Sequence, residues 1–122
     1  MASFARLIRP HVDAELRAAA EADARADAAL AFRHLERAHV LGQSSTVQHV
    51  RVHWRMFVWG WRQRKTRECL GQLFRLAGAA TMTAFGLVPA GNTGGANVSP
   101  YQPMPVDPDL AALIEQARSS PS

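Results

Sequence analysis

Three histidines and one glutamate have the residue types and the spacing of a metal site. His49 and His53 are four residues apart, which places two imidazoles on one helix face where both can bind one ion. Upstream, Glu36 and His39 form an E-x-x-H unit, the i, i+3 pairing by which helical bundles present a carboxylate together with an imidazole. Such a ligand set suits a divalent transition metal, namely Zn, Cu, Ni, Co or Fe, without distinguishing among them.

A short turn decides whether the two pairs meet. With a turn centred near residue 43 or 44, the flanking helices form an antiparallel hairpin that brings Glu36 and His39 level with His49 and His53. His34 points about 140° away from His39 around a helix, so we assign it as a supporting or alternative ligand. The competing interpretation is that these histidines are hydrogen-bonded residues of a small core.

A glycine-rich loop is a candidate lid for this site. Because the third helix runs back antiparallel to the second, the loop that follows it returns to the histidines, and its glycines permit a close backbone approach. The alternative is a plain connector, and a phosphate loop is excluded because no G-K-[ST] follows. The candidate lid residues are Asn92, Thr93, Gly94 and Gly95. Glu68 and Cys69 are expected at the far end of the third helix, away from the cluster.

Basic and aromatic residues alternate around the turn between the second and third helices. The set is Trp59, Trp61, Arg62, Arg64 and Lys65, and the segment 44–75 carries seven Arg and Lys residues against Glu68 alone. Such a surface could bind nucleic acid or a membrane, but no known binding motif frames it, so we favour neither partner. The alternative is a solvated turn with tryptophans in the core or at a contact between copies, since so small a core favours a homo-oligomer.

These residues must be positioned by helices, and the sequence predicts an all-α fold. We expect an antiparallel bundle of three main helices, over 10–41, 45–62 and 66–87, because these stretches combine good helix formers with apolar residues at helical spacing. Ser45 and Gln48 form a capping box at the start of the second helix. A Gly/Pro-rich loop over 90–106 leads to a short helix over 108–118, with Pro108 at its first position.

Size and composition restrict the chain further. Its 122 residues and net charge of +4 suit a single domain over 1–122. A single cysteine excludes an intrachain disulfide and an all-cysteine metal site. The sequence has no secretory signal pattern and no apolar stretch of membrane-spanning length, so we expect a cytoplasmic protein.

Several segments resemble an uncharacterised bacterial family known only as a domain of unknown function. They are the H-L-E-R-A-H-x-L-G-Q segment over 34–43, the two downstream histidines, the Gly71-Gln72 pair and the G-N-T-G-G segment over 91–95. The resemblance covers about residues 24 to 114. It implies a bacterial helical protein whose relatives are associated with heavy-metal resistance gene sets, and it implies no catalytic role.

Three hypotheses follow for the function. The first is a metal-binding helical protein, non-catalytic, with Glu36, His39, His49 and His53 as ligands and a role in metal homeostasis or resistance. The second is a small metalloenzyme in which the same metal polarises a water and Glu36 acts as the base. The third is a helical adaptor without metal that binds a partner through the tryptophan and arginine surface.

Overall fold

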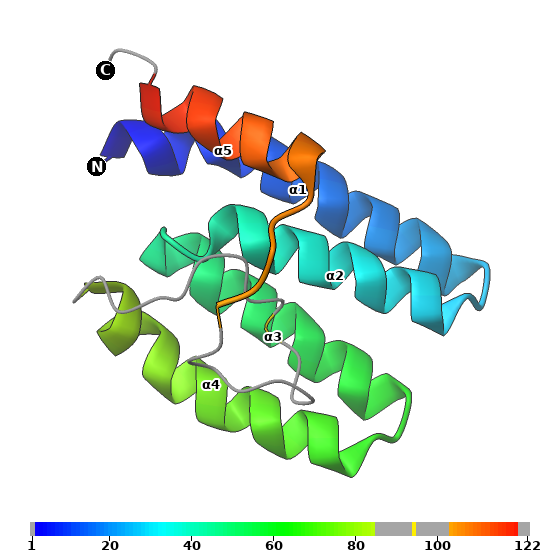
Figure 1. Cartoon of the computed structure of the whole chain (residues 1–122). Helices are drawn as coiled ribbons and strands as arrows, with labels where there is room; N and C mark the ends of the chain where they lie inside the picture. The colour runs from blue at the N-terminus through cyan, green and yellow to red at the C-terminus, as the bar shows by residue number, and fades with distance from the viewer. Residues whose placement is uncertain (1, 85–93, 95–102, 120–122) are drawn as a thin grey trace.

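Five helices make up the described part of the chain in the computed structural model, which covers residues 2–84, 94 and 103–119. The helices are α1 (Ala2–Ala24), α2 (Ala28–Gly42), α3 (Thr46–Arg62), α4 (Thr66–Ala84) and α5 (Pro108–Ser119). The first four follow one another as antiparallel neighbours, and α5 lies beside α1 (Figure 1). No strand occurs in these ranges, which confirms the predicted all-α class and the bundle of packed helices.

The long helix expected over 10–41 is wrong, because the chain turns back at residues 25–27 and forms α1 and α2 instead. Ala26 has a φ of 61°, and the amide of Asp27 donates to the carbonyl of Ala22, the bond that closes a Schellman motif. The Asp27 side chain then accepts from the amide of Leu30 at 3.1 Å and caps α2. The sequence does not indicate this turn, because an alanine occupies the left-handed position where glycine is usual.

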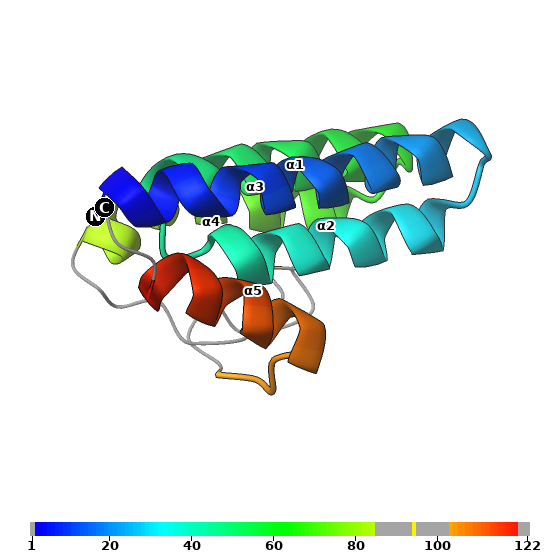
Figure 2. The same cartoon turned by 90° about the horizontal axis from the view of Figure 1, so that it is seen from above.

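The two hairpins pack through apolar residues at helical spacing. On α1, Ile8, Val12, Leu16 and Ala19 are buried and recur every three or four residues, so they form one continuous face. This face packs mainly on α2, and α3 packs on α2 and α4. The view from above shows α1 and α2 running side by side along the first hairpin (Figure 2). The helical core therefore holds α2 and α3 side by side, and this packing positions the predicted metal ligands.

The α2–α3 turn is as tight as the sequence predicts. Ser45 caps α3, with its hydroxyl accepting from the amide of Gln48 at 3.5 Å. Gly42 is the last residue of α2, and a Cβ built there would lie only 2.8 Å from the Cβ of Gln48. Glycine thus permits the close approach of the two helices immediately below the histidines.

A salt-bridge network joins α5 to the first hairpin. Arg37 on α2 lies 3.1 Å from the carboxylate of Glu15 on α1, and it also lies 3.4 Å from Asp107 and 2.5 Å from Asp109 at the start of α5. These partners raise the pKa of Arg37 further above its usual range, with the hydrogen bond to Asp109 as the largest cause. Within the described ranges no helix is sufficiently long and apolar to cross a bilayer.

Candidate metal centre

Three buried imidazoles meet where α2 and α3 lie side by side. His39 comes from α2, and His49 and His53 come from successive turns of α3. Their ring centroids are 4.7 to 4.9 Å apart, and the side chains are at most 5% exposed. One potential ligand nitrogen from each residue lies within 4.8 Å of the other two. The turn register inferred from the sequence therefore placed these three residues together, as the structure does.

One pair of nitrogens already has the separation of two ligands on one ion. The Nε2 atoms of His39 and His53 are 3.2 Å apart. Two nitrogens bound tetrahedrally to zinc at about 2.0–2.1 Å would be about 3.3 Å from each other.

The hydrogen bonds around His53 determine which of its nitrogens is available to a metal. The side-chain amide of Gln72 on α4 donates to Glu68 at 2.5 Å and to the carbonyl of Gly94 at 2.8 Å. Its oxygen therefore faces the Nδ1 atom of His53, at 2.5 Å, and must accept from it. With the proton on Nδ1, the Nε2 atom of neutral His53 carries the lone pair and points at His39.

Burial keeps the imidazoles of His49 and His53 neutral. It is the main cause that lowers the pKa of His49 to about 3 and the pKa of His53 to about 4. The positive charge of Arg75 lowers both pKa values further, whereas the hydrogen bond to Gln72 raises that of His53. At neutral pH the site thus offers deprotonated nitrogens, the form that binds metal ions.

Gly94 covers the ring of His39. It is buried, has a φ of +84°, and a Cβ built on it would lie 2.4 Å from Cδ2 and 2.8 Å from Nε2 of that imidazole. Only glycine fits this position, because a side chain would be strained and would displace the ring. Of the candidate lid, Gly94 therefore lies at the cluster, while Asn92, Thr93 and Gly95 lie outside the described residues.

Glu36 is close to the cluster but outside its group of potential ligand atoms. Among the described residues, that group contains the three histidines alone. The Glu36 side chain is half-buried one turn before His39, and burial is the main cause that raises the pKa of its carboxyl group. Arg33 opposes this shift and Glu68 adds to it. Glu36 as a direct ligand therefore stays a prediction, whereas the three histidines form a compact group of potential ligand atoms.

A polar stripe on α4 was missed by the sequence reasoning. Glu68, Gln72 and Arg75 lie at i, i+4 and i+7 and turn toward α3. The expectation that Glu68 lies away from the cluster is wrong, because it accepts from Gln72, which in turn contacts His53. The available signal was this spacing, since the turn near residue 64 places residues 72 to 75 opposite His53.

The other histidines and the cysteine lie elsewhere. His34, expected as a supporting or alternative ligand, instead contacts Glu15 on α1 through its Nδ1 atom at 2.8 Å. Its partner is thus on α1, whereas the imidazole cluster joins α2 to α3. Cys69 is buried, with its thiol 3.8 Å from the carbonyl of Phe57, as expected for a structural residue.

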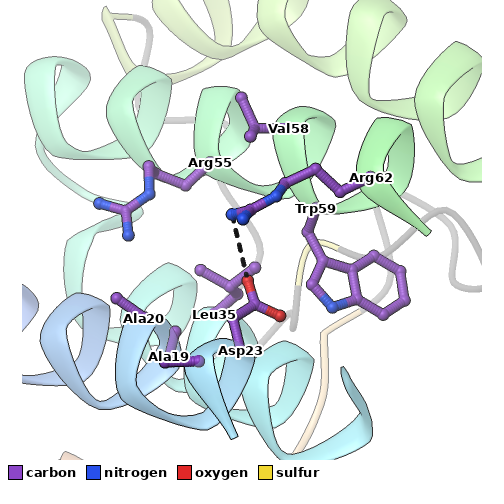
Figure 3. A pocket seen from close by; sticks show the side chains of 9 residues that line it. Ala19, Ala20, Asp23, Leu35, Arg55, Val58, Trp59 and Arg62 are labelled. Carbon is purple, nitrogen blue, oxygen red and sulfur yellow. Dashed lines mark ion pairs between the residues drawn. The ribbon is translucent and has the colours of Figure 1, made fainter. Parts of the chain in front are cut away.

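The expected basic and aromatic surface divides into a buried and an exposed part. Trp59 is not on the surface: it is 6% exposed, packs against Phe32 with tilted rings whose centroids are 4.5 Å apart, and donates its indole N–H to the carbonyl of Ala28. Beside it, Arg62 reaches across a hollow between α1 and α3 to Asp23, 3.8 Å away (Figure 3).

The exposed part of this surface combines apolar side chains with cations. Trp61 is 70% exposed, and it belongs to a face on α3 and α4 that includes Trp54, Leu70, Leu73 and Phe74. Lys65 extends over the ring of Trp59 at 5.2 Å, and Arg64 is exposed at the turn with a φ of 56°. The cations therefore cluster at the α3–α4 turn, next to exposed apolar side chains.

The fold and the site together define a small all-helical protein with a buried cluster of three imidazoles. By comparison with family models, the chain belongs to the family described as "Protein of unknown function (DUF3703)", whose model matches residues 6–114. The matched range contains all three histidines as well as Gln72 and Gly94. No curated protein and no solved structure matches the chain.

Proposed function

We propose that this protein binds one divalent transition-metal ion through His39, His49 and His53. The observation that carries the proposal is the orientation of His53, whose Nδ1 atom is held by Gln72 while its Nε2 atom lies 3.2 Å from that of His39. A metal-binding histidine typically donates its other ring N–H to a fixed acceptor in this way, because the bond sets the tautomer and the ring direction. A role in metal homeostasis or resistance is the function we assign to such a site, in keeping with the resemblance noted from the sequence.

The chemistry of the site favours ions of intermediate softness. Neutral imidazoles bind Zn, Cu, Ni, Co and Fe, whereas Mg and Ca prefer oxygen ligands. Among the residues that the structure describes, the group of close ligand atoms consists of three histidine nitrogens and no carboxylate oxygen, and Gly94 covers the ring of His39. We therefore propose a transition metal as the cofactor or cargo.

Metal content of the purified protein tests this proposal. Untagged protein, purified without chelator, is analysed by inductively coupled plasma mass spectrometry before and after loading with each of the five metals. The parent is expected to hold about one ion per chain. A His49→Ala/His53→Ala variant should hold none.

A matched double variant controls for the loss of histidines as such. His11→Ala/His34→Ala removes two imidazoles that lie outside the cluster, so it should bind metal like the parent. Circular dichroism shows whether each variant remains helical. A parent that takes up none of the five metals, or an equal loss in both double variants, would contradict the proposal.

A metalloenzyme is the second candidate, and the half-buried carboxyl group of Glu36 favours it. Burial raises its pKa toward the range in which a carboxylate accepts a proton near neutral pH. Three imidazoles leave a coordination position for a water, as in catalytic zinc sites. A Glu36→Gln variant that keeps its metal but loses a hydrolytic activity found in the parent would support catalysis.

A further inference from the structure

The hairpin of α3 and α4 carries a continuous, exposed apolar surface. The rings of Trp54 and Phe57 stack with centroids 5.5 Å apart, and those of Phe57 and Trp61 are 6.2 Å apart, so the three form one stripe along α3. Phe57 and Trp61 also line a groove together with two leucines of α4. The two helices thus share one surface, the apolar face, which comprises Trp54, Phe57, Trp61, Leu70, Leu73 and Phe74.

The apolar face is open to solvent and does not support the core. Trp61 is 70% exposed, Leu70 is 63% exposed, and Phe74, one turn beyond Leu70, is 66% exposed. The buried residues of α3, among them Val52 and Met56, lie on the other side of that helix. Small proteins seldom expose a contiguous apolar patch, and such a patch usually marks a contact with a partner or a membrane.

Cations border the apolar face at the α3–α4 turn. Arg64 and Lys65 line the same groove as the apolar side chains, and Arg67 is exposed in the first turn of α4. None of these three cations forms an ion pair with another residue that the structure describes. The segment 44–75 has a single acidic residue, Glu68, whose carboxylate accepts a hydrogen bond from a buried amide inside the bundle. The three cations are therefore available to an anionic partner.

We propose that the apolar face docks this protein on the surface of an anionic lipid bilayer. A helix lies in a membrane interface when Trp, Phe and Leu side chains occupy one side of it and Arg and Lys side chains lie beside them. The long cationic side chains reach the head groups while their stems remain on the apolar surface. Because α3 and α4 are antiparallel neighbours, both helices can lie in the membrane plane at once (Figure 1). This inference is independent of the proposed metal site.

Two other occupants fit these observations less well. In a dimer formed through this face, the partner copy would present the same apolar and cationic side chains, with no acidic side chain on the face to pair with them. A nucleic acid can stack its bases on Trp54 and Trp61, but it offers no apolar surface to the leucines and Phe74 of α4. An anionic bilayer supplies hydrocarbon and negative charge together, as this face requires.

Vesicle binding by the full-length protein tests the proposal. The protein is mixed with vesicles of phosphatidylcholine alone, or of phosphatidylcholine with an equal part of phosphatidylglycerol, at low and at high salt. Sedimentation measures the bound fraction. Tryptophan fluorescence is recorded in the same samples, because the exposed Trp54 and Trp61 should shift their emission to shorter wavelength in the interface. Light scattering after size-exclusion chromatography gives the oligomeric state.

Two variants separate the charges from the apolar face. Arg64→Gln/Lys65→Gln removes two cations at the turn, and Trp61→Gln removes an exposed ring. The matched control is Arg6→Gln/Arg17→Gln, which removes the same amount of charge from exposed positions on α1. All of these side chains are exposed, so each variant should keep the helical fold, and circular dichroism verifies this.

The parent is expected to bind the vesicles with phosphatidylglycerol more tightly than the others, with a shift of its fluorescence, and more weakly at high salt. Arg64→Gln/Lys65→Gln should lose about 10- to 30-fold in affinity, since each cation near an anionic surface contributes about fivefold. Trp61→Gln should lose about tenfold, because less apolar surface leaves water. The control on α1 should bind like the parent.

Three results would overturn the inference. A parent that binds neither kind of vesicle would leave the face to a protein partner. A dimer that Trp61→Gln dissociates, in a parent that ignores vesicles, would assign the face to a second copy of the chain. Equal losses in the turn variant and in the control on α1 would show that net charge, and not this face, attracts the membrane. Each result leaves the proposed metal site as it stands.

Discussion

At the scale of single residues, the site depends on the side chain that fixes the tautomer of His53. Gln72→Leu keeps the approximate size of the side chain but removes the acceptor for the Nδ1 proton and the contact to the carbonyl of Gly94. We expect metal affinity to fall by about 10- to 100-fold, as is typical when a histidine ligand loses its partner. Competition with a chromophoric chelator measures the change.

A glutamine outside the site provides the control for this prediction. Gln116→Leu replaces an exposed glutamine on α5, and its metal affinity should equal that of the parent. The role assigned to Gln72 is refuted if Gln72→Leu folds and binds metal with the affinity of the control.

Gly94 gives a second test at this scale. Gly94→Ala places a methyl group 2.4 Å from Cδ2 of His39 and forces an alanine to a φ of +84°, so the imidazole must move. We expect a loss of about 1–2 kcal/mol in the free energy of unfolding and a fall of about tenfold or more in metal affinity. Denaturant unfolding and chelator competition measure the two quantities.

Gly60→Ala separates the loss of stability from the loss of metal. It introduces a milder contact, 3.2 Å from the thiol sulfur of Cys69, in a part of α3 that is two turns from His53. We expect its free energy of unfolding to fall while its metal affinity stays that of the parent. Unchanged affinity in Gly94→Ala would show that Gly94 does not position His39.

The sequence was sufficient to bring His39, His49 and His53 together, because one short turn sets their register. The sequence was not sufficient to predict which residues surround these three histidines. Gln72 and Arg75 are not metal ligands by type, so a search for ligand spacing passes over them. Glu36 was expected to bind the metal because of its i, i+3 spacing to His39, and among the described residues it is outside the group of close ligand atoms that the three histidines form.

At the scale of helices, the break between α1 and α2 is the main difference from the sequence prediction. The all-α class, the α2–α3 hairpin and the start of α5 at Pro108 follow from helix propensity, a capping serine and an N-terminal proline. The break at Ala26 depends instead on the energy gained when α1 packs on α2. Such long-range packing is not visible in local propensity, which favours continuing the helix.

This turn predicts a stabilising and a destabilising substitution. Ala26→Gly relieves an alanine held at a φ of 61°, so we expect the free energy of unfolding to rise by up to about 1 kcal/mol. Asp27→Ala removes the cap of α2 and should lower the free energy of unfolding by about 1 kcal/mol. Urea unfolding followed by circular dichroism measures both changes.

Asp27→Asn is the control, because asparagine caps a helix about as well as aspartate. It should be close to the parent in stability. An Ala26→Gly variant less stable than the parent, in the same experiment, would show that the chain does not turn at this residue.

At the scale of the whole molecule, the two hairpins expose different surfaces. The hairpin of α1 and α2 is covered by α5 and tied to it by Arg37. The hairpin of α3 and α4 exposes Trp54, Trp61 and Phe74 beside the cationic turn. The imidazole cluster lies where the hairpins meet, so any relative movement of α2 and α3 changes the distance from His39 to the other two histidines.

Metal-free protein should therefore lose stability as the pH falls, because its buried imidazoles stay neutral. In the folded state His49 and His53 take up protons only near their lowered pKa values of about 3 and 4, whereas in the unfolded chain they do so near the ordinary value of 6.5. Between pH 6.5 and about 4 the unfolded state thus binds more protons. Each histidine lowers the free energy of unfolding by up to about 1.4 kcal/mol per pH unit in this window.

Urea unfolding of the metal-free protein at intervals from pH 7.5 to 5 measures this slope, above the range in which ordinary carboxylates titrate. A His49→Gln/His53→Gln variant lacks the contributions of these two histidines. The raised pKa of Glu36 has the opposite effect, because the folded protein binds that proton more tightly than the unfolded chain and so gains stability as the pH falls. We expect the slope of this variant to be flat or reversed. The same slope in parent and variant would mean that both imidazoles can take up protons inside the folded bundle, and would refute their burial as neutral groups.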